Sequence, residues 1–165
     1  MTRREFRRAK KFIFTDIHRE IRLAQVTKSV QGEATLRKIR IPRGGGNFVA
    51  ALGLLCYTEF GGKLKYNCKR KNGADHASEN FNKFFDELGA GYRTFRASGV
   101  NVYNVFRCGL AHEYYVKGNC TIFMDSNIPG AGIGRNLNGS FYFIVGRYYE
   151  DLKNAFNRLE THLFP

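Results

Sequence analysis

The stretch "SFYFIVGRYYEDLKNAFNRLETHL", residues 140–163, changes its apolar period in the middle. Its first six residues are mostly aromatic or β-branched, which is typical of a short strand. From Arg147 onward the apolar residues recur at helical spacing, and two acidic residues stand in the first turn, where the helix dipole favours negative charge. The helical positions are Tyr148, Tyr149, Leu152, Ala155, Phe156, Leu159 and Leu163. The stretch therefore predicts a strand up to Val145 and a helix over 147–163.

A second strand-like run, "CTIFMD", lies before this stretch, and the glycine-rich segment "SNIPGAGIGRNLNG" separates the two runs. Two neighbouring strands joined by a loop are expected to pair. The sequence therefore predicts a β-hairpin built from Cys120–Met124 and Phe141–Val145. Because the apolar period is helical on both sides, the hairpin is expected as an insertion, at about 120–145, between the last two helices.

Helical spacing also runs through most of the chain before the hairpin. The glycines and proline of "IRIPRGGGN" are expected to break the first helix from the second, with Asn47 as the N-cap of the second. The spacing predicts helices over 5–28, 47–60, 78–95 and 101–117. The predicted fold is mainly α, a bundle of about five helices with a β-hairpin insertion, in one domain that covers residues 1–165.

The charge of the chain is strongly positive. The 165 residues include 27 Lys and Arg against 14 Asp and Glu, which gives a net charge of +13 and a sequence pI of about 9.9. Such a balance favours a polyanionic partner, and we expect RNA. The predicted helix over 5–28 carries part of this charge, and a second cluster surrounds an Asn-Gly turn signal. The candidate RNA-binding residues of that cluster are Lys63, Lys65, Lys69, Arg70 and Lys71.

Several functional classes lack their sequence signals. The four cysteines, Cys56, Cys68, Cys108 and Cys120, have no CxxC or Cys-His spacing, so no zinc site is expected. Neither "FGGKL" nor "GAGIGRNLNG" meets the pattern of a nucleotide-binding glycine loop, and no cofactor is expected. No apolar run is long enough to span a bilayer and no signal peptide is recognisable, so a cytoplasmic location is expected.

One segment combines an apolar helical pattern with two polar groups that resist burial. It reads "VFRCGLAHEYYVKGN", residues 105–119, and it holds Arg107 and His112. Arginine is almost never fully buried without a partner, and histidine is intermediate in burial. The two side chains are therefore expected either to be satisfied structurally or to line a working surface.

The motif in this segment, "RCGLAH", resembles the HEPN superfamily of small helical bundles, in which an Arg-x4-6-His motif marks ribonucleases that act as dimers. The resemblance covers the bundle from about Asn47 to Leu163 and depends chiefly on Arg107, Gly109, Leu110 and His112. It implies an endoribonuclease that needs no metal and uses Arg107 and His112 as catalytic residues. It also implies a toxin or defence role, with a nucleotidyltransferase-type antitoxin as an acidic protein partner.

Helix geometry adds an expectation about this pair. Five residues along an α-helix separate two side chains by roughly 140° and 7.5 Å, so Arg107 and His112 are not neighbours on one α-helix. In a homodimer, two copies of the helix would bring both pairs into one cleft. There the imidazole would move a proton of the ribose 2′-OH, and the guanidinium would bind the phosphate.

Two alternatives stay open at this point. Active HEPN members commonly have a polar residue after the motif arginine, where this chain has Cys108. In the first alternative, the protein is a non-catalytic RNA-binding, nucleotide-binding or protein-interaction module. In the other alternative the pair is purely structural: His112 is satisfied in the core or at a helix end, and Arg107 pairs with one of the nearby acids, Glu113, Asp86 or Glu87.

Overall fold

The structure, a computed structural model, describes residues 1–26, 28–40, 46–113 and 116–165. The chain is mainly helical with a small sheet before its last helix, which confirms the predicted fold class. In chain order the elements are α1 (Arg3–Val26), α2 (Val30–Lys38), α3 (Asn47–Tyr66), α4 (Ala77–Asp86), α5 (Ala90–Ala97), the π-helix η1 (Tyr103–Glu113), β1 (Cys120–Phe123), β2 (Ile133–Arg135), β3 (Phe141–Ile144) and α6 (Val145–Leu163).

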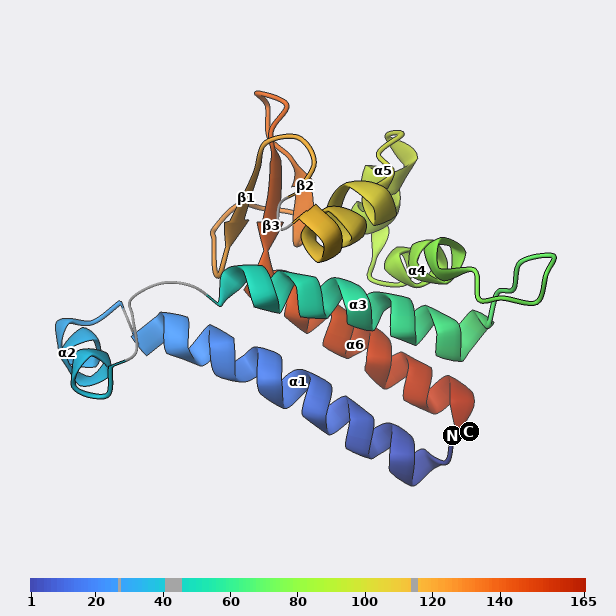
Figure 1. The fold of residues 1–165 in the computed structure, drawn as a ribbon, viewed down its shortest axis with the longest axis horizontal. Helices are drawn as coiled ribbons and strands as arrows, with labels where there is room; N and C mark the ends of the chain where they lie inside the picture. Colours follow the sequence, from blue (N-terminus) through green and yellow to red (C-terminus); the bar gives the residue numbers. More distant parts are fainter. Residues whose placement is uncertain (27, 41–45, 114–115) are drawn as a thin grey trace.

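The long helices α3 and α6 form the centre of the molecule (Figure 1). Helix α1 packs against both of them on one side, while α4, η1 and the sheet lie on the other side. Phe156 of α6 joins the two sides, because its ring makes edge contacts with Phe14 of α1 and with Phe84 of α4, each at 5.5 Å between ring centres. One continuous aromatic core therefore supports both faces of the α3 and α6 pair.

Helices α3 and α4 approach closely because α3 has no side chain at the contact. A Cβ atom added at Gly62 would lie 1.9 Å from the carbonyl oxygen of Asn80. Asn80 is itself buried, and its side-chain oxygen accepts a hydrogen bond from the backbone N–H of Cys68 at 2.8 Å. The close contact thus anchors the start of the loop between α3 and α4, where the basic cluster lies.

Most helix predictions agree with the structure in position. The exceptions have local causes. The region 78–95 is divided into α4 and α5, because Gly89 adopts a positive φ of 143° between them. Helix α2 was not predicted. Ser29 caps it by accepting a hydrogen bond from the Gly32 N–H at 3.0 Å. Asn47 is not the N-cap of α3, since Gly46 holds that place, and the Asn47 side chain instead donates to the carbonyl of Ile122 in β1.

The sheet differs from the predicted hairpin. The strands expected at 120–124 and 141–145 exist as β1 and β3, but they pair in parallel. The unpredicted strand β2 pairs with β3 in the antiparallel sense, so the strand order is β1-β3-β2. The connection between β1 and β3 is long enough for a parallel crossover. Strand β2 was missed because its three residues, with only Ile133 β-branched, show no alternation.

None of the helices in the described ranges combines the length and apolar character that a membrane crossing requires.

Candidate functional site

The motif segment forms η1, which is a π-helix rather than the predicted α-helix. The apolar side chains Phe106 and Leu110 of η1 are buried, as is Val102 just before it, as expected from their spacing. Phe106 packs edge-on against Phe141 of β3, with 5.2 Å between ring centres. One side of η1 is therefore fixed in the core, and its other side faces α3 and solvent. Residues 114 and 115, the end of the predicted helix, lie outside the described residues.

The π-helical winding corrects the expected separation of Arg107 and His112. In a π-helix each backbone N–H donates to the carbonyl five residues earlier, so residues five apart follow one another after about one turn. His112 therefore stands on the same side of η1 as Arg107, instead of roughly 140° away as on an α-helix. Arg107 is largely buried and His112 is exposed, whereas Phe106 and Leu110 have no exposed surface.

Arg107 forms an ion pair with Glu59 of α3, not with any of the three acids considered from the sequence. The Arg107 Nε and Glu59 Oε2 atoms lie 2.9 Å apart and are buried, but they are not aligned for a hydrogen bond. The side chains are 21% and 24% exposed. The guanidinium also lies over the ring of Tyr103, at 5.6 Å from its centre. Nothing in the motif indicated Glu59, although it is the sole acid in the sequence of α3.

The three acids expected as partners of Arg107 have other contacts. Asp86 accepts from the Arg96 Nε at 2.8 Å. Glu87 pairs with a lysine of α3, and Glu113 pairs with Lys117, at 2.9 Å between Nζ and Oε1. The expected pairing was wrong because the packing of η1 on α3 sets the partner, and that packing joins residues distant in the sequence.

The electrostatics of the Arg107 site keep its guanidinium charged. Burial is the largest single influence and disfavours the charge, but the Glu59 carboxylate and the neighbouring Cys56, Tyr103 and Cys108 together outweigh it, and the pKa of Arg107 is raised. At Cys56, one turn before Glu59 on α3, burial outweighs the nearby charges. Burial raises the pKa of its thiol, although the Arg107 charge opposes this shift. A cation with a neutral thiol beside it can bind an anionic group but offers no thiolate nucleophile.

The predicted RNA-binding cluster is partly neutralised by its own acids. Lys63 and Lys69 both pair with Asp75, and these contacts lower the pKa of that carboxyl to about 2. Lys65 pairs with Glu87, at 2.6 Å between Nζ and Oε1. The remaining two cations, Arg70 and Lys71, are exposed, and their side chains make no ion pair or hydrogen bond with the residues that the structure describes.

The cluster lies beside the Arg107 site. Lys63 follows Glu59 by four residues, so it stands roughly 6 Å further along the same face of α3. The structure thus brings one end of the predicted RNA-binding cluster toward the predicted catalytic arginine. Tyr66, by contrast, already has partners within the protein. Its hydroxyl donates to Glu87, and the Lys83 Nζ lies 5.6 Å from its ring centre.

Neither a metal site nor a known relative accounts for this arrangement. Among the described residues no three His, Cys, Asp or Glu side chains gather as metal ligands, and all four cysteines are free. Comparison of the chain with protein-family models, curated protein sequences and solved structures finds no match.

Proposed function

We propose that the protein is a metal-independent endoribonuclease in which Arg107 and His112 act on the scissile phosphodiester. One observation carries the proposal: η1 winds as a π-helix, so a charged arginine and an exposed histidine five residues apart stand on one side of it. π-Helical turns are rare and occur frequently at functional sites. The resemblance of "RCGLAH" to the HEPN motif supports the same pair.

The chemistry follows from the two side chains. The neutral His112 imidazole accepts the proton of a ribose 2′-OH, and the 2′-oxygen attacks the adjacent phosphorus. The bond from phosphorus to the 5′-oxygen breaks, and the leaving oxygen takes a proton from an imidazolium. The products are a 2′,3′-cyclic phosphate and a free 5′-OH. DNA lacks the nucleophile and is not cut.

Arg107 supplies positive charge where negative charge develops on the phosphate. Its Nε faces Glu59, which leaves the two terminal nitrogens without a hydrogen-bond partner among the described residues. These nitrogens form a planar fork that matches two phosphate oxygens. Glu59 acts as a positioning residue, because it holds the guanidinium without occupying the fork.

A homodimer would complete the reaction by supplying a second histidine. When two copies of η1 face one another, one His112 removes the 2′-OH proton and the other protonates the leaving oxygen. The HEPN resemblance carries this dimer as well as the antitoxin partner, and both stay predictions.

A second function has an observation in its favour. The Glu59 carboxylate already compensates the Arg107 charge, and Cys108 stands where active HEPN members commonly have a polar residue. Both features suit a protein that binds RNA without cutting it. The loop cations Arg70 and Lys71 would then provide the principal contacts.

The two functions are separated by a cleavage assay in excess chelator. Wild-type protein is incubated with a single-stranded RNA and with the DNA of the same sequence, and the products are tested for a cyclic phosphate end. We expect cleavage of RNA alone, and loss of cleavage by at least a hundredfold in His112→Ala, the usual range for a general acid or base. His162→Ala, which removes another exposed histidine at the end of α6, is the matched control.

Melting temperatures distinguish catalysis from folding. An exposed His112 leaves no cavity, so its replacement should leave the melting temperature unchanged. Binding of RNA by wild type without any cleavage would select the non-catalytic function. Cleavage that survives in His112→Ala would exclude the proposed catalytic pair.

A further inference from the structure

A second basic surface lies on the opposite side of α3 from the Arg107 site. It is a groove of about 310 Å³ between α1 and α6. Four cations line it: Arg7, Lys10 and Lys11 from α1, and Lys153 from α6. No carboxylate is among the lining residues. The groove is built by two helices that are distant in sequence, so neither of the basic clusters recognised in the sequence defines it.

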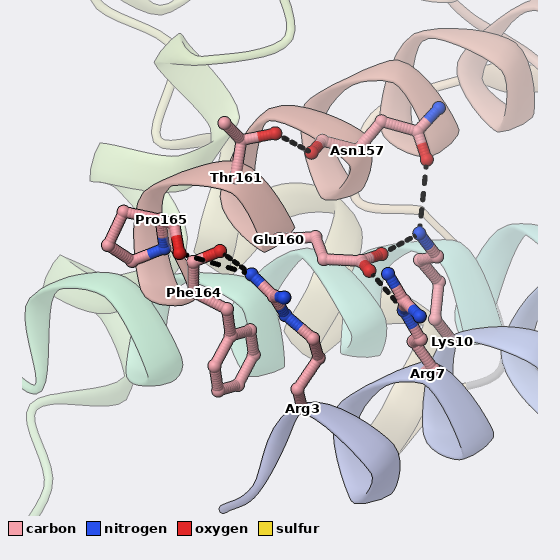
Figure 2. A network of polar contacts seen from close by, with 8 residues as sticks. All are labelled: Arg3, Arg7, Lys10, Asn157, Glu160, Thr161, Phe164 and Pro165. Carbon is pink, nitrogen blue, oxygen red and sulfur yellow. Dashed lines mark hydrogen bonds and ion pairs between the residues drawn. The ribbon is translucent and has the colours of Figure 1, made fainter.

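Neighbouring acids neutralise only part of this charge. Glu160 of α6 lies between Arg7 and Lys10 at one end, and it accepts from the Arg7 Nε at 2.6 Å (Figure 2). Glu150 lies 3.8 Å from the Lys153 Nζ. Lys11 is exposed, and its side chain has no ion pair or hydrogen bond with any residue in the described ranges. Two acids against four cations leave the groove positive.

The cations are arranged along the helix rather than around one point. Arg7 and Lys11 are four residues apart, and His18 follows seven residues later on the same face of α1. Eleven residues of α-helix extend roughly 16 Å. A linear polyanion makes several contacts over such a length, whereas a single small anion would use only one part of it.

An aromatic platform closes one end of this line. The ring of His18 lies parallel to that of Tyr149, with 6.2 Å between ring centres and 18° between planes. Tyr149 is buried and also contacts Phe14 edge-on, so the stack rests on the core. His18 is exposed. Histidine is among the side chains on which unstacked bases lie in complexes with single strands.

We infer that the groove between α1 and α6 binds the backbone of single-stranded nucleic acid, with the His18 ring as a stacking surface for one base. A line of cations beside an aromatic platform is the usual arrangement for this ligand. A lipid surface fits poorly, because the apolar face of α1, including Ile13 and Ile17, is already buried in the core. No ribose-specific contact is implied, so RNA and DNA are both ligands of the groove.

The test measures binding with strands that the proposed cleavage reaction cannot cut. Fluorescence anisotropy is recorded for the full-length protein with a labelled oligothymidine and with a 2′-O-methyl RNA, at salt concentrations from about 50 to 200 mM. Lys11→Ala/Lys153→Ala removes two groove cations. Each contact to a single strand contributes roughly 0.7 to the log-log salt slope, so the slope should fall by roughly 1.4 and the affinity about tenfold near physiological salt.

A matched control removes the same charge elsewhere. Arg37→Ala/Lys38→Ala changes two exposed cations of α2, which is remote from the groove (Figure 1). The control should change affinity less than threefold. An equal loss of affinity in both double variants would show that only the net charge of the protein matters, and it would overturn the inference. Unchanged affinity in the groove variant would overturn it as well.

Two further measurements identify the ligand. His18→Ala should weaken binding of oligothymidine by fivefold or more, in line with the usual value of one stacked base, but leave an abasic strand unaffected. Complete displacement of the strand by inorganic pyrophosphate at an equal phosphate concentration would show a small-anion site and overturn the inference. Groove-dependent binding to anionic lipid vesicles, with none to the strand, would overturn it too. Because no step of this test involves cleavage, its result can be interpreted even if the protein has no ribonuclease activity.

Discussion

The α1 and α6 contact and the α3 and η1 contact each set an arginine of one helix against a glutamate of the other, but at different depths. Arg7 meets Glu160 at 2.6 Å with its side chain 63% exposed, and a second cation, Lys10, which is 22% exposed, pairs with the same carboxylate. Arg107 meets Glu59 at 2.9 Å with both side chains about three-quarters buried. Arg107 has given up more hydration than Arg7, so losing Glu59 leaves a charge that water cannot fully compensate. Similar ion pairs thus join α1 to α6 at one contact and η1 to α3 at the other.

The largest expected effect is at the deeper pair. Glu59→Gln removes the carboxylate charge but keeps the size of the side chain. It should lower the free energy of unfolding by roughly 1–3 kcal/mol, because the largely buried Arg107 is left without its counter-charge. Urea denaturation measures the change.

A double variant separates a charge effect from poor packing. Glu59→Leu/Arg107→Met replaces both charges by apolar groups of similar length, and it should recover most of the lost stability. If the two single changes simply add in the double variant, the ion pair is not the cause of the loss.

This deeper contact also marks the limit of prediction from the sequence. The helices α1 and α6 were predicted to within a few residues, and α3 begins where predicted but continues from residue 60 to Tyr66. The steps from Val102, just before η1, to Phe106 and from Phe106 to Leu110 fit one side of a helix of either type, so the π-helical winding had no signal in the sequence. That winding decides how Arg107 and His112 are placed.

Long-range partners escaped prediction for a different reason. Arg107 and Glu59 are 48 positions apart, and no local pattern relates them. The groove cations Lys11 and Lys153 are further apart still, and they share a surface only because α1 packs on α6. Residue types at a site can be recognised from a motif, whereas their partners follow from tertiary packing.

A smaller effect is expected at the exposed pair. Arg7→Gln should cost about 1 kcal/mol or less, since the Arg7 side chain is largely hydrated and Glu160 keeps its pair with Lys10. High salt should abolish the difference from wild type, because the Debye length falls to about 3 Å at 1 M. Glu59→Gln should keep most of its effect at the same salt concentration. Urea denaturation of both variants at low and high salt makes the comparison, and equal salt sensitivity would remove the distinction between the two contacts.

The smallest expected effect is the acid dependence of a third group, the partly exposed Asp75 in the loop between α3 and α4. Lys63 and Lys69 lower the pKa of Asp75 from 3.8 to about 2 in the folded state. A carboxyl with a lowered folded pKa stabilises the fold above its unfolded pKa and loses that contribution as the pH falls through the folded pKa. The Asp75 contribution should therefore be present above about pH 4 and disappear by about pH 2. Asp75→Asn has no such group, so its melting temperature should fall less steeply than that of wild type across this window. If the melting temperatures of the two proteins fell equally steeply with pH, the Asp75 carboxylate would not contribute to stability. The loop would then hold Lys63 and Lys69 without it.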